Sequence, residues 1–233
     1  MRILCTICAR GGSKGLVNKN LKKIKNKHLI YYTINQAKKS KFFDKIILST
    51  DSKKIQQVSK KYGLESYFLR SKSLSNSKIG KVPVIKDALI KAEKIFKTNF
   101  DYIVDLDVTS PLRLVSDIKK GFKKIINENS DILFSVNKTR VDPYFNSVEM
   151  KSDKSFRPIK SLGNKIKRRQ DSPKVYDLNA CFYIWKRQAL LKYDTLYIKK
   201  NSIYVMPDNR GFDIDDEIDF KVVNYLMKNE LYK

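Results

Sequence analysis

The chain has 233 residues, of which 42% are hydrophobic and 31% are charged, a composition that supports a packed core and excludes an intrinsically disordered protein. Lysine and arginine outnumber aspartate and glutamate by 49 to 24, and the resulting net charge of +25 raises the question of a nucleic-acid partner. The lysines are spread over almost every segment, however, and the aromatic residues do not line up with them. A lysine-rich solvated surface therefore explains the charge at least as well, and nucleic-acid binding is the second hypothesis.

The N-terminal stretch joins an apolar run over residues 3–9 to a basic, glycine-rich loop. The run suits a strand that is covered on both faces, as in a parallel sheet. The loop combines cations with glycines, which let backbone N–H groups approach an anion. It matches neither the Walker pattern nor the dinucleotide fingerprint, so it predicts a triphosphate site of another kind, with a basic turn that binds nothing as the alternative. The residues are Arg10, Gly11, Gly12, Lys14, Gly15 and Lys19.

Strands and helices then alternate, which predicts a parallel sheet wrapped by helices. Asp51 and Ser52 are expected to cap the second helix, and Gly63 to end it. Helices are expected over residues 29–39, 52–62, 82–96, 117–127, 187–192 and 217–228, and strands over residues 45–50, 65–69, 102–106, 132–137, 177–185 and 202–206.

Residues 138–176 interrupt this alternation. They contain turn residues, scattered aromatic residues and a basic cluster over residues 165–169, but no long periodic helix. We expect an α/β domain from residues 1–137 and 177–233, with an inserted arm between them. Tyr144 and Phe145 would suit a subunit interface, and the basic cluster is the best local argument for nucleic acid.

Several polar residues follow directly after expected strands. In open α/β sheets, ligands bind beyond the carboxyl ends of the strands. Arg10, Asp51, Arg70 and Asp107 are therefore expected to meet at one edge of the sheet. Any one of them could be ordinary, since Asp51 alone is most simply a helix cap, but their convergence predicts a binding site.

An acidic cluster precedes the last expected helix. Asp213 and Asp215 alternate with hydrophobic residues, so in an extended segment both carboxylates face the same way, about 7 Å apart at the backbone. That geometry allows them to share a hard cation such as Mg²⁺. Asp216 and Glu217 instead open the helix, where acidic residues complement its dipole. The alternative is that all four acids cap this helix.

The cysteine and histidine content argues against a disulfide, a zinc site and a histidine-based catalytic triad. Cys5, Cys8 and Cys181 lie in apolar runs, and a single histidine, His28, adds no zinc-ligand spacing. Reduced, buried thiols are expected. No segment predicts a signal peptide or a membrane span, so we expect a cytoplasmic protein with no membrane partner.

Together these motifs resemble those of the acylneuraminate cytidylyltransferases, the CMP-sialic acid synthetase family. The resemblance runs in order along essentially the entire chain and implies a Rossmann-like nucleotidyltransferase domain. It also implies that the anomeric hydroxyl of a nonulosonic acid, a nine-carbon 2-keto-3-deoxy sugar acid, attacks the α-phosphate of CTP and releases pyrophosphate. The matching stretches are ARGGSKG (9–15), KNL (19–21), STD (49–51), Arg70, TSPLR (109–113), RRQ (168–170), NACFY (179–183) and FDIDDEID (212–219).

The resemblance also implies residue roles. Arg10, Lys19 and Asp213 would be catalytic, and Asp213 and Asp215 would hold Mg²⁺. The arm would make a homodimer by reaching over the neighbour's active site. Ser13 and Lys14 would join Arg10 and Lys19 at the triphosphate. The full set of substrate-binding residues would be Ser13, Lys14, Asn20, Arg70, Asp107, Ser110, Arg169, Asn179 and Tyr183.

One departure from the family pattern bears on the sugar. Sialate-specific members usually carry Gln-Pro before the TSPLR stretch, where this chain has Asp107 and Val108. The acid at this position and the YDLNA form of residues 176–180 are similar to the legionaminic acid branch. We therefore expect a CMP-legionaminate synthetase. Close alternatives are CMP-N-acetylneuraminate and CMP-pseudaminate synthetases, followed by a 3-deoxy-manno-octulosonate cytidylyltransferase.

Overall fold

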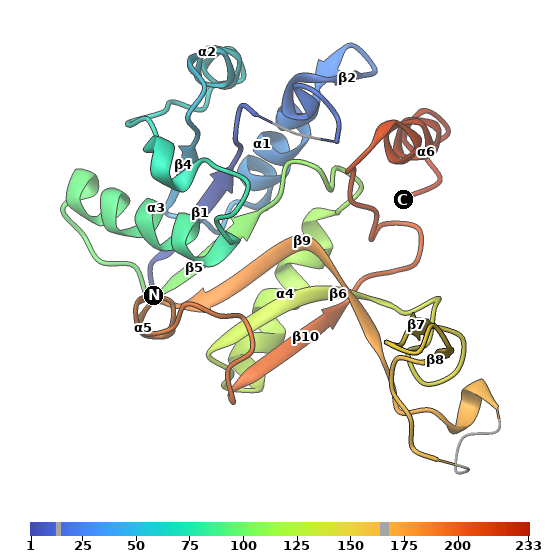
Figure 1. Cartoon of the computed structure of the whole chain (residues 1–233). Coiled ribbons are helices and arrows are strands. Elements are labelled where there is room, and N and C mark those ends of the chain that lie inside the picture. The colour runs from blue at the N-terminus through green and yellow to red at the C-terminus, as the bar shows by residue number, and fades with distance from the viewer. Residues whose placement is uncertain (13–14, 164–167) are drawn as a thin grey trace.

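The computed structural model describes residues 1–12, 15–163 and 168–233 (Figure 1). Its centre is a six-stranded sheet in the order β10-β6-β9-β5-β1-β4. Neighbouring strands run parallel except at β9, which is antiparallel to both β5 and β6. The mostly parallel α/β sheet predicted from the sequence is thereby confirmed. Its strands are β1 (Ile3–Cys8), β4 (Lys45–Ser49), β5 (Tyr102–Leu106), β6 (Ile132–Lys138), β9 (Tyr176–Lys186) and β10 (Asn201–Val205).

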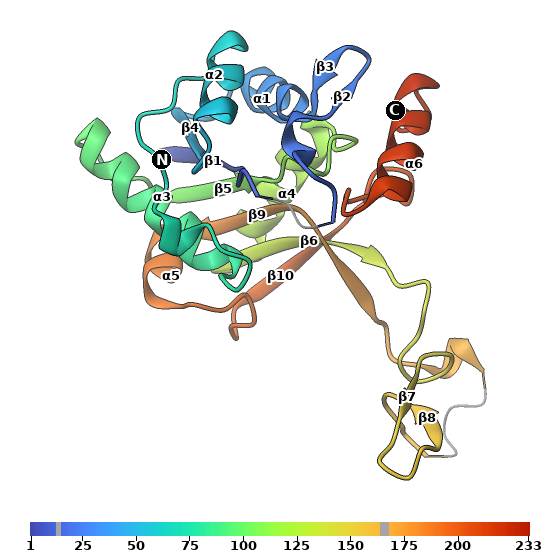
Figure 2. The same cartoon turned by 45° about the horizontal axis from the view of Figure 1, so that its top comes forward.

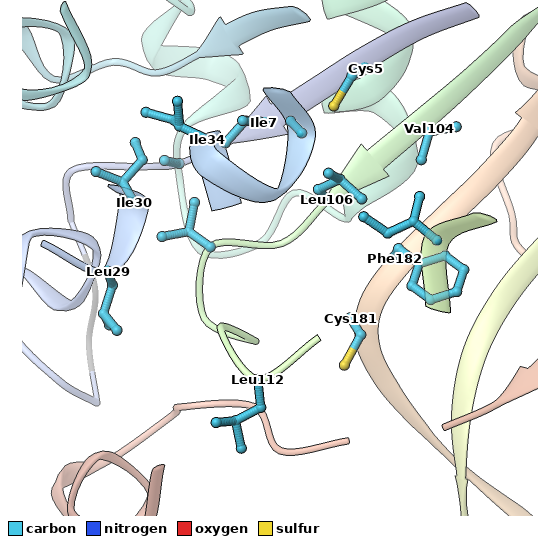
Figure 3. Packing of buried hydrophobic residues seen from close by; sticks show 14 of the residues in the cluster. Cys5, Ile7, Leu29, Ile30, Ile34, Val104, Leu106, Leu112, Cys181 and Phe182 are labelled. Atoms are coloured by element: carbon cyan, nitrogen blue, oxygen red, sulfur yellow. The ribbon is translucent and has the colours of Figure 1, made fainter. Parts of the chain in front are cut away.

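Helices cover both faces of the sheet. Successive residues of a strand point to opposite faces, so Cys5 and Ile7 of β1 join the core under α1, α4 and α6, while Leu4 joins the core under α3 and α5. Figure 3 shows part of the first core, including Ile30, Leu106 and Phe182. The helices are α1 (Leu29–Ser40), α2 (Lys53–Lys61), α3 (Lys81–Phe96), α4 (Val115–Asn127), α5 (Arg187–Lys192) and α6 (Glu217–Lys228), with 3₁₀ turns η1 (Lys19–Leu21), η2 (Lys72–Leu74) and η3 (Arg169–Asp171).

The strand expected over residues 65–69 is absent from the described structure. Side-chain bonds hold this segment instead of a ladder, because the Gln56 amide donates to the Ser66 hydroxyl and to the Phe68 carbonyl, at 2.8 and 3.0 Å. Only its end meets the sheet, where the Arg70 N–H donates to Thr50 O at 2.8 Å. The local sequence predicted a strand here but could not indicate whether it has a pairing partner.

The basic connector before α1 forms a small hairpin of β2 (Lys23–Ile24) and β3 (Lys27–His28). Lys25 and Asn26 at its turn both have positive φ, at 46° and 61°, as a type I′ turn requires.

The segment between β6 and β9 projects from the body as an arm (Figure 2). It carries a hairpin of β7 (Val148–Met150) and β8 (Phe156–Pro158). Apolar side chains on this arm are exposed, among them Phe145, Met150 and Phe156. Among the described helices, none is both long and apolar enough to cross a membrane.

Candidate active site

A cavity of about 300 Å³ lies at the carboxyl ends of β1 and β5. The described walls come from the loop after β1, from residues 70–84, from the turn after β5 and from the segment before α6. Six residues named from the sequence line it, so segments far apart in the chain converge as expected for an α/β sheet. They are Arg10, Lys19, Asn20, Arg70, Asp107 and Asp213.

Asp51 anchors the loop after β1. Its Oδ1 accepts a hydrogen bond from the Gly11 N–H at 2.8 Å and lies 3.8 Å from Nη2 of Arg70, a buried side chain. The expectation that Asp51 caps α2 is therefore wrong, because Ser52 alone is the cap, with its Oγ accepting from the Ile55 N–H at 3.3 Å. The carboxylate instead fixes the backbone next to Arg10.

Lys19 and Gly15 join this loop to the segment before α6. The Lys19 ammonium donates to Ile214 O at 2.7 Å and to Asp215 Oδ1 at 3.0 Å. A Cβ at Gly15 would lie 2.4 Å from Asp215 O, so only glycine allows this approach. Asn20 is buried and donates to Arg10 O at 2.9 Å. The basic loop and the acidic segment are thus held as one unit.

Asp213 and Asp215 lie in different environments. Asp213 lines the cavity, and its Oδ1 is buried with no hydrogen-bond partner within the described part of the chain. Burial, reinforced by the charge of Asp107, raises the pKa of Asp213 to about 6, although the Thr109 hydroxyl and Lys19 oppose the shift. The Asp215 side chain is 78% exposed and contacts the cavity through Lys19.

The donor set at these two acids fits a hard divalent cation. The described residues include no group of three or more His, Cys, Asp or Glu side chains that could hold a metal by themselves. Mg²⁺ needs no such group in a nucleotide site, because it binds one or two carboxylates together with substrate phosphates. The unpaired Asp213 oxygen is an available ligand of the right kind.

Lys81, at the start of α3, was not predicted. Its ammonium bonds Asp107 Oδ2, lies 3.2 Å from Asp105 Oδ2 and sits 5.5 Å from the ring centroid of Tyr183. Burial alone would raise the pKa of Asp107, but Lys81 and two hydrogen bonds from Thr109 outweigh it and hold this pKa at about 2. Burial has the opposite effect on Lys81 and lowers its pKa, but the charges of Asp105 and Asp107 raise this pKa well above its ordinary value.

Two sequence signals could have located this ion pair. A lysine in the first turn of a helix opposes the helix dipole, so Lys81 needs another reason for its position. Asp105 interrupts an apolar strand, and a buried acid requires a partner. What the sequence could not supply was the pairing of the two.

A family model described as cytidylyltransferase matches residues 4–232. The chain belongs to the cytidylyltransferase family. It is therefore a nucleotidyltransferase, as the motif resemblance implied. It is 46% identical to a CMP-N,N'-diacetyllegionaminic acid synthase of Campylobacter jejuni over 97% of this chain and 94% of the relative. It is also 43% identical to a post-translational flagellin modification protein B of Campylobacter coli, covering 98% and 96% of the two chains.

A solved structure supports the fold. CMP:2-keto-3-deoxy-manno-octonic acid synthetase, determined in complex with CTP, aligns with a TM-score of 0.68 and covers 99% of this chain and 100% of its own. Sequence identity is 15%, so this likeness concerns the architecture alone.

Four of the predicted substrate-binding residues do not line the described walls of the cavity of this cytidylyltransferase. Ser110 is fully buried, and Tyr183 is buried with its ring centroid 5.5 Å from the Lys81 ammonium. Asn179 is buried at the start of β9, where its side chain bonds other protein groups. Arg169 lies in the arm and donates to Thr139 O at 2.8 Å. Two further residues, Ser13 and Lys14, lie outside the described residues.

Arg113 fixes the turn that follows β5 in the enzyme. Its guanidinium is fully buried and donates to Cys181 O, to Gln36 Oε1 at 2.9 Å and to Asp107 O at 3.2 Å. Burial lowers the pKa of this group. The arginine of the TSPLR stretch therefore binds backbone and amide oxygens behind the cavity and sets the position of Asp107.

Proposed function

We propose that this enzyme transfers CMP from CTP to a nonulosonic acid, N,N'-diacetyllegionaminic acid or a close relative, and releases pyrophosphate. The convergence of three cations, Arg10, Lys19 and Arg70, with Asp213 in one cavity carries this proposal. The choice of sugar is supported by the 46% identity to a synthase of CMP-N,N'-diacetyllegionaminic acid and by Asp107 before the TSPLR stretch.

The reaction asks for positioning and charge neutralisation more than for covalent catalysis. The anomeric oxygen of the sugar forms a bond to the α-phosphorus, the bond from that phosphorus to the bridging oxygen breaks, and pyrophosphate leaves with the electron pair. We assign Arg10 and Lys19, together with Ser13 and Lys14, to the triphosphate. Asn20 keeps Arg10 in place, and buried Arg70 is the cation for the nucleotide.

We assign Mg²⁺ to Asp213 and Asp215. When bound, the ion would neutralise phosphate charge and lower the pKa of the attacking hydroxyl. This assignment is supported by an oxygen of Asp213 that is buried near Lys19 and Asp107 and has no hydrogen-bond partner among the described residues. Cytoplasmic residence is part of the same proposal and is supported by free cysteines at positions 5, 8 and 181.

The sugar-binding assignments are Asp107, Ser110, Arg169, Asn179 and Tyr183. A guanidinium such as that of Arg169 suits the carboxylate of the sugar acid. Its place in the arm is explained if the enzyme is a homodimer in which the arm of one subunit reaches the cavity of the other.

Two surface features support the homodimer. The arm exposes Met150 and Phe156 at 66% and 67%, and such side chains favour burial against a partner. Between the root of the arm and the edge of the sheet lies a groove lined mainly by apolar and aromatic residues, including Phe134, Tyr144 and Tyr197.

Pyrophosphate release in the presence of CTP and Mg²⁺ tests the reaction. We expect turnover to be highest with N,N'-diacetyllegionaminic acid when it is compared with N-acetylneuraminic, pseudaminic and 3-deoxy-manno-octulosonic acids, and to be unaffected by added polynucleotide. A clear preference for another of these acids would move the sugar assignment to it. No turnover with any of them by a folded protein would show that the proposed acceptor class is wrong.

Mixing two inactive variants tests the action of Arg169 across the dimer. Arg169→Ala and Asp213→Asn should each be inactive as homodimers, because every site lacks one group. After subunit exchange, half of the dimers carry one complete site, so about a quarter of the wild-type activity should return. If Arg169 serves its own subunit, mixing restores nothing. Arg168→Ala is a matched control, since Arg168 pairs with Asp171 inside the arm at 3.0 Å and should leave activity intact.

A further inference from the structure

A chain of amide hydrogen bonds connects the root of the arm to the segment that carries Asp213. Nδ2 of Asn179, in β9, donates to Oδ1 of Asn137 at 2.7 Å. Nδ2 of Asn137, in β6, then donates to Gly211 O at 2.8 Å. In Figure 1, the chain between β10 and α6 leaves the sheet beside the point where β6 and β9 continue into the arm. β6 is therefore bonded directly to the backbone two residues before Asp213, and β9 is connected to it through Asn137.

The root of the arm is an irregular, strained part of the sheet. The register of β6 against β9 shifts between Phe134 and Val136, and Ala180 has a φ of 55°, a left-handed conformation that costs free energy for a residue with a Cβ. Oδ1 of Asn179 accepts from the Ser135 hydroxyl at 2.7 Å and from the Cys181 N–H at 3.2 Å. These bonds hold the bulge and orient the Asn179 amide toward Asn137.

Gly211 is fitted to Asn137. A Cβ at position 211 would lie 1.7 Å from Oδ1 of Asn137, closer than any real contact. The φ of Gly211 lies outside the left-handed region, where Gly63 and Gly163 are found. The backbone conformation therefore does not require glycine at position 211. Glycine is required there because any larger residue would clash with the Asn137 side chain.

The segment around Asp213 is anchored on both sides. Before it, Arg210 donates to the fully buried Asp117 through two nitrogens, at 3.0 and 2.8 Å. After it, the Ile214 N–H donates to Thr109 O at 3.0 Å. Oδ1 of Asp213 itself has no hydrogen-bond partner among the described residues, so this oxygen is aimed by the backbone. The bond from Asn137 to Gly211 is the anchor that also reaches the arm.

We propose that Asn137 is a positioning residue that couples the root of the arm to the orientation of Asp213. A change in the placement of the arm moves β6 and β9 at Asn137 and Asn179, and the amide chain passes that displacement to Gly211. The inference rests on the proposed function only in that Asp213 takes part in the transfer. It assigns to Asn137 a role that needs no contact with either substrate.

The test compares Asn137→Ala with Asn201→Ala. Asn201 is a matched control in the neighbouring strand β10, where its Nδ2 donates to Ile198 O at 2.5 Å, away from the site. We expect Asn137→Ala to speed amide hydrogen exchange over residues 211–216 and to lower kcat about tenfold, while the KM for CTP changes less than about twofold. Asn201→Ala should change neither the exchange nor the kcat.

A second variant, Gly211→Ala, tests whether the effect depends on the contact between Asn137 and Gly211. Gly211→Ala should also lower kcat about tenfold, because the new Cβ displaces the Asn137 amide. In the Asn137→Ala background the same change should cost less than about twofold, since the opposing oxygen is gone. Should Asn137→Ala fail to fold, faster exchange over residues 211–216 together with a tenfold lower kcat in Gly211→Ala supports the coupling, and wild-type exchange or wild-type kcat in that variant overturns it.

The outcomes separate this proposal from the reaction. Unchanged exchange in Asn137→Ala, or faster exchange with unchanged kcat, would overturn the coupling, as would an equal cost of Gly211→Ala in both backgrounds. If the wild-type chain shows no turnover with any sugar acid while Asn137→Ala speeds exchange at residues 211–216, the coupling is supported and the proposed transfer is refuted.

Discussion

We expect Asp213→Asn to lower kcat by at least about a hundredfold, because the charge that completes the acidic side of the cavity is worth several kcal/mol in the transition state. The isosteric amide keeps the shape of the side chain and removes only its charge. The fold should be unaffected, since Oδ1 of Asp213 makes no hydrogen bond within the described structure. Steady-state pyrophosphate release and thermal unfolding of the same preparation measure the two properties.

Asp216→Asn is the matched control, three residues further along the acidic cluster. Oδ1 of Asp216 accepts from the N–H groups of Ile218 and Asp219, at 2.8 and 2.9 Å, and so caps α6. Asparagine caps a helix about as well as aspartate, so activity and stability should both persist. Equal losses in Asp213→Asn and Asp216→Asn would contradict the catalytic assignment of Asp213.

The second large effect concerns stability. Lys81→Met should lower the free energy of unfolding by about 3 kcal/mol at neutral pH, because it leaves two buried carboxylates without their counter-ion. Asp105 is fully buried, and the Asp107 side chain is 18% exposed. Chemical denaturation at a series of pH values measures the loss.

The pH dependence of that loss has a definite sign. In the wild type the pKa of Asp107 is held at about 2, below its ordinary 3.8, so its contribution is present above about pH 4 and is lost as the pH falls toward 2. Without Lys81, burial raises the pKa of Asp107 above its unfolded value. The variant therefore loses stability as the pH rises from about 4 to that raised pKa. The gap between the two proteins should therefore be widest at neutral pH and shrink below pH 4.

A double substitution checks the assignment. Asp107→Asn added to Lys81→Met removes one of the uncompensated charges and should recover part of the lost stability at neutral pH. A gap that stays constant from pH 7 to pH 3, or a double variant no more stable than Lys81→Met, would contradict the ion-pair interpretation.

Local sequence patterns were sufficient to predict where most helices and strands lie. Periodicity located α6 at residues 217–228 and β5 at residues 102–106 as the structure has them, because an amphipathic helix and a buried strand are encoded by nearby residues. Whether a strand finds a partner is a long-range matter, and this is why residues 65–69 were assigned wrongly. The sequence also could not predict that β9 is antiparallel to its neighbours. A buried strand has the same apolar pattern whether its neighbours run parallel or antiparallel to it.

The candidate site divides in the same way. Arg10, Arg70 and Asp107 were grouped correctly because each follows a strand or an extended segment ending at one edge, a consequence of topology that alternation reveals. Lys81 starts a helix, and its partner Asp105 lies inside a strand, so their meeting depends on how α3 packs on the sheet. The roles proposed for Ser110, Arg169, Asn179 and Tyr183 came from resemblance and remain predictions.

The reversed direction of β9 has a consequence for how this family can vary. Because β9 is antiparallel to β5 and β6, it begins at the same edge of the sheet at which β6 ends. The chain between them can lengthen, shorten or change its composition without altering the six-stranded frame, and every such change occurs on the side where ligands bind. The length and composition of the arm can therefore vary among related enzymes while the sheet that carries the cavity keeps its strand order.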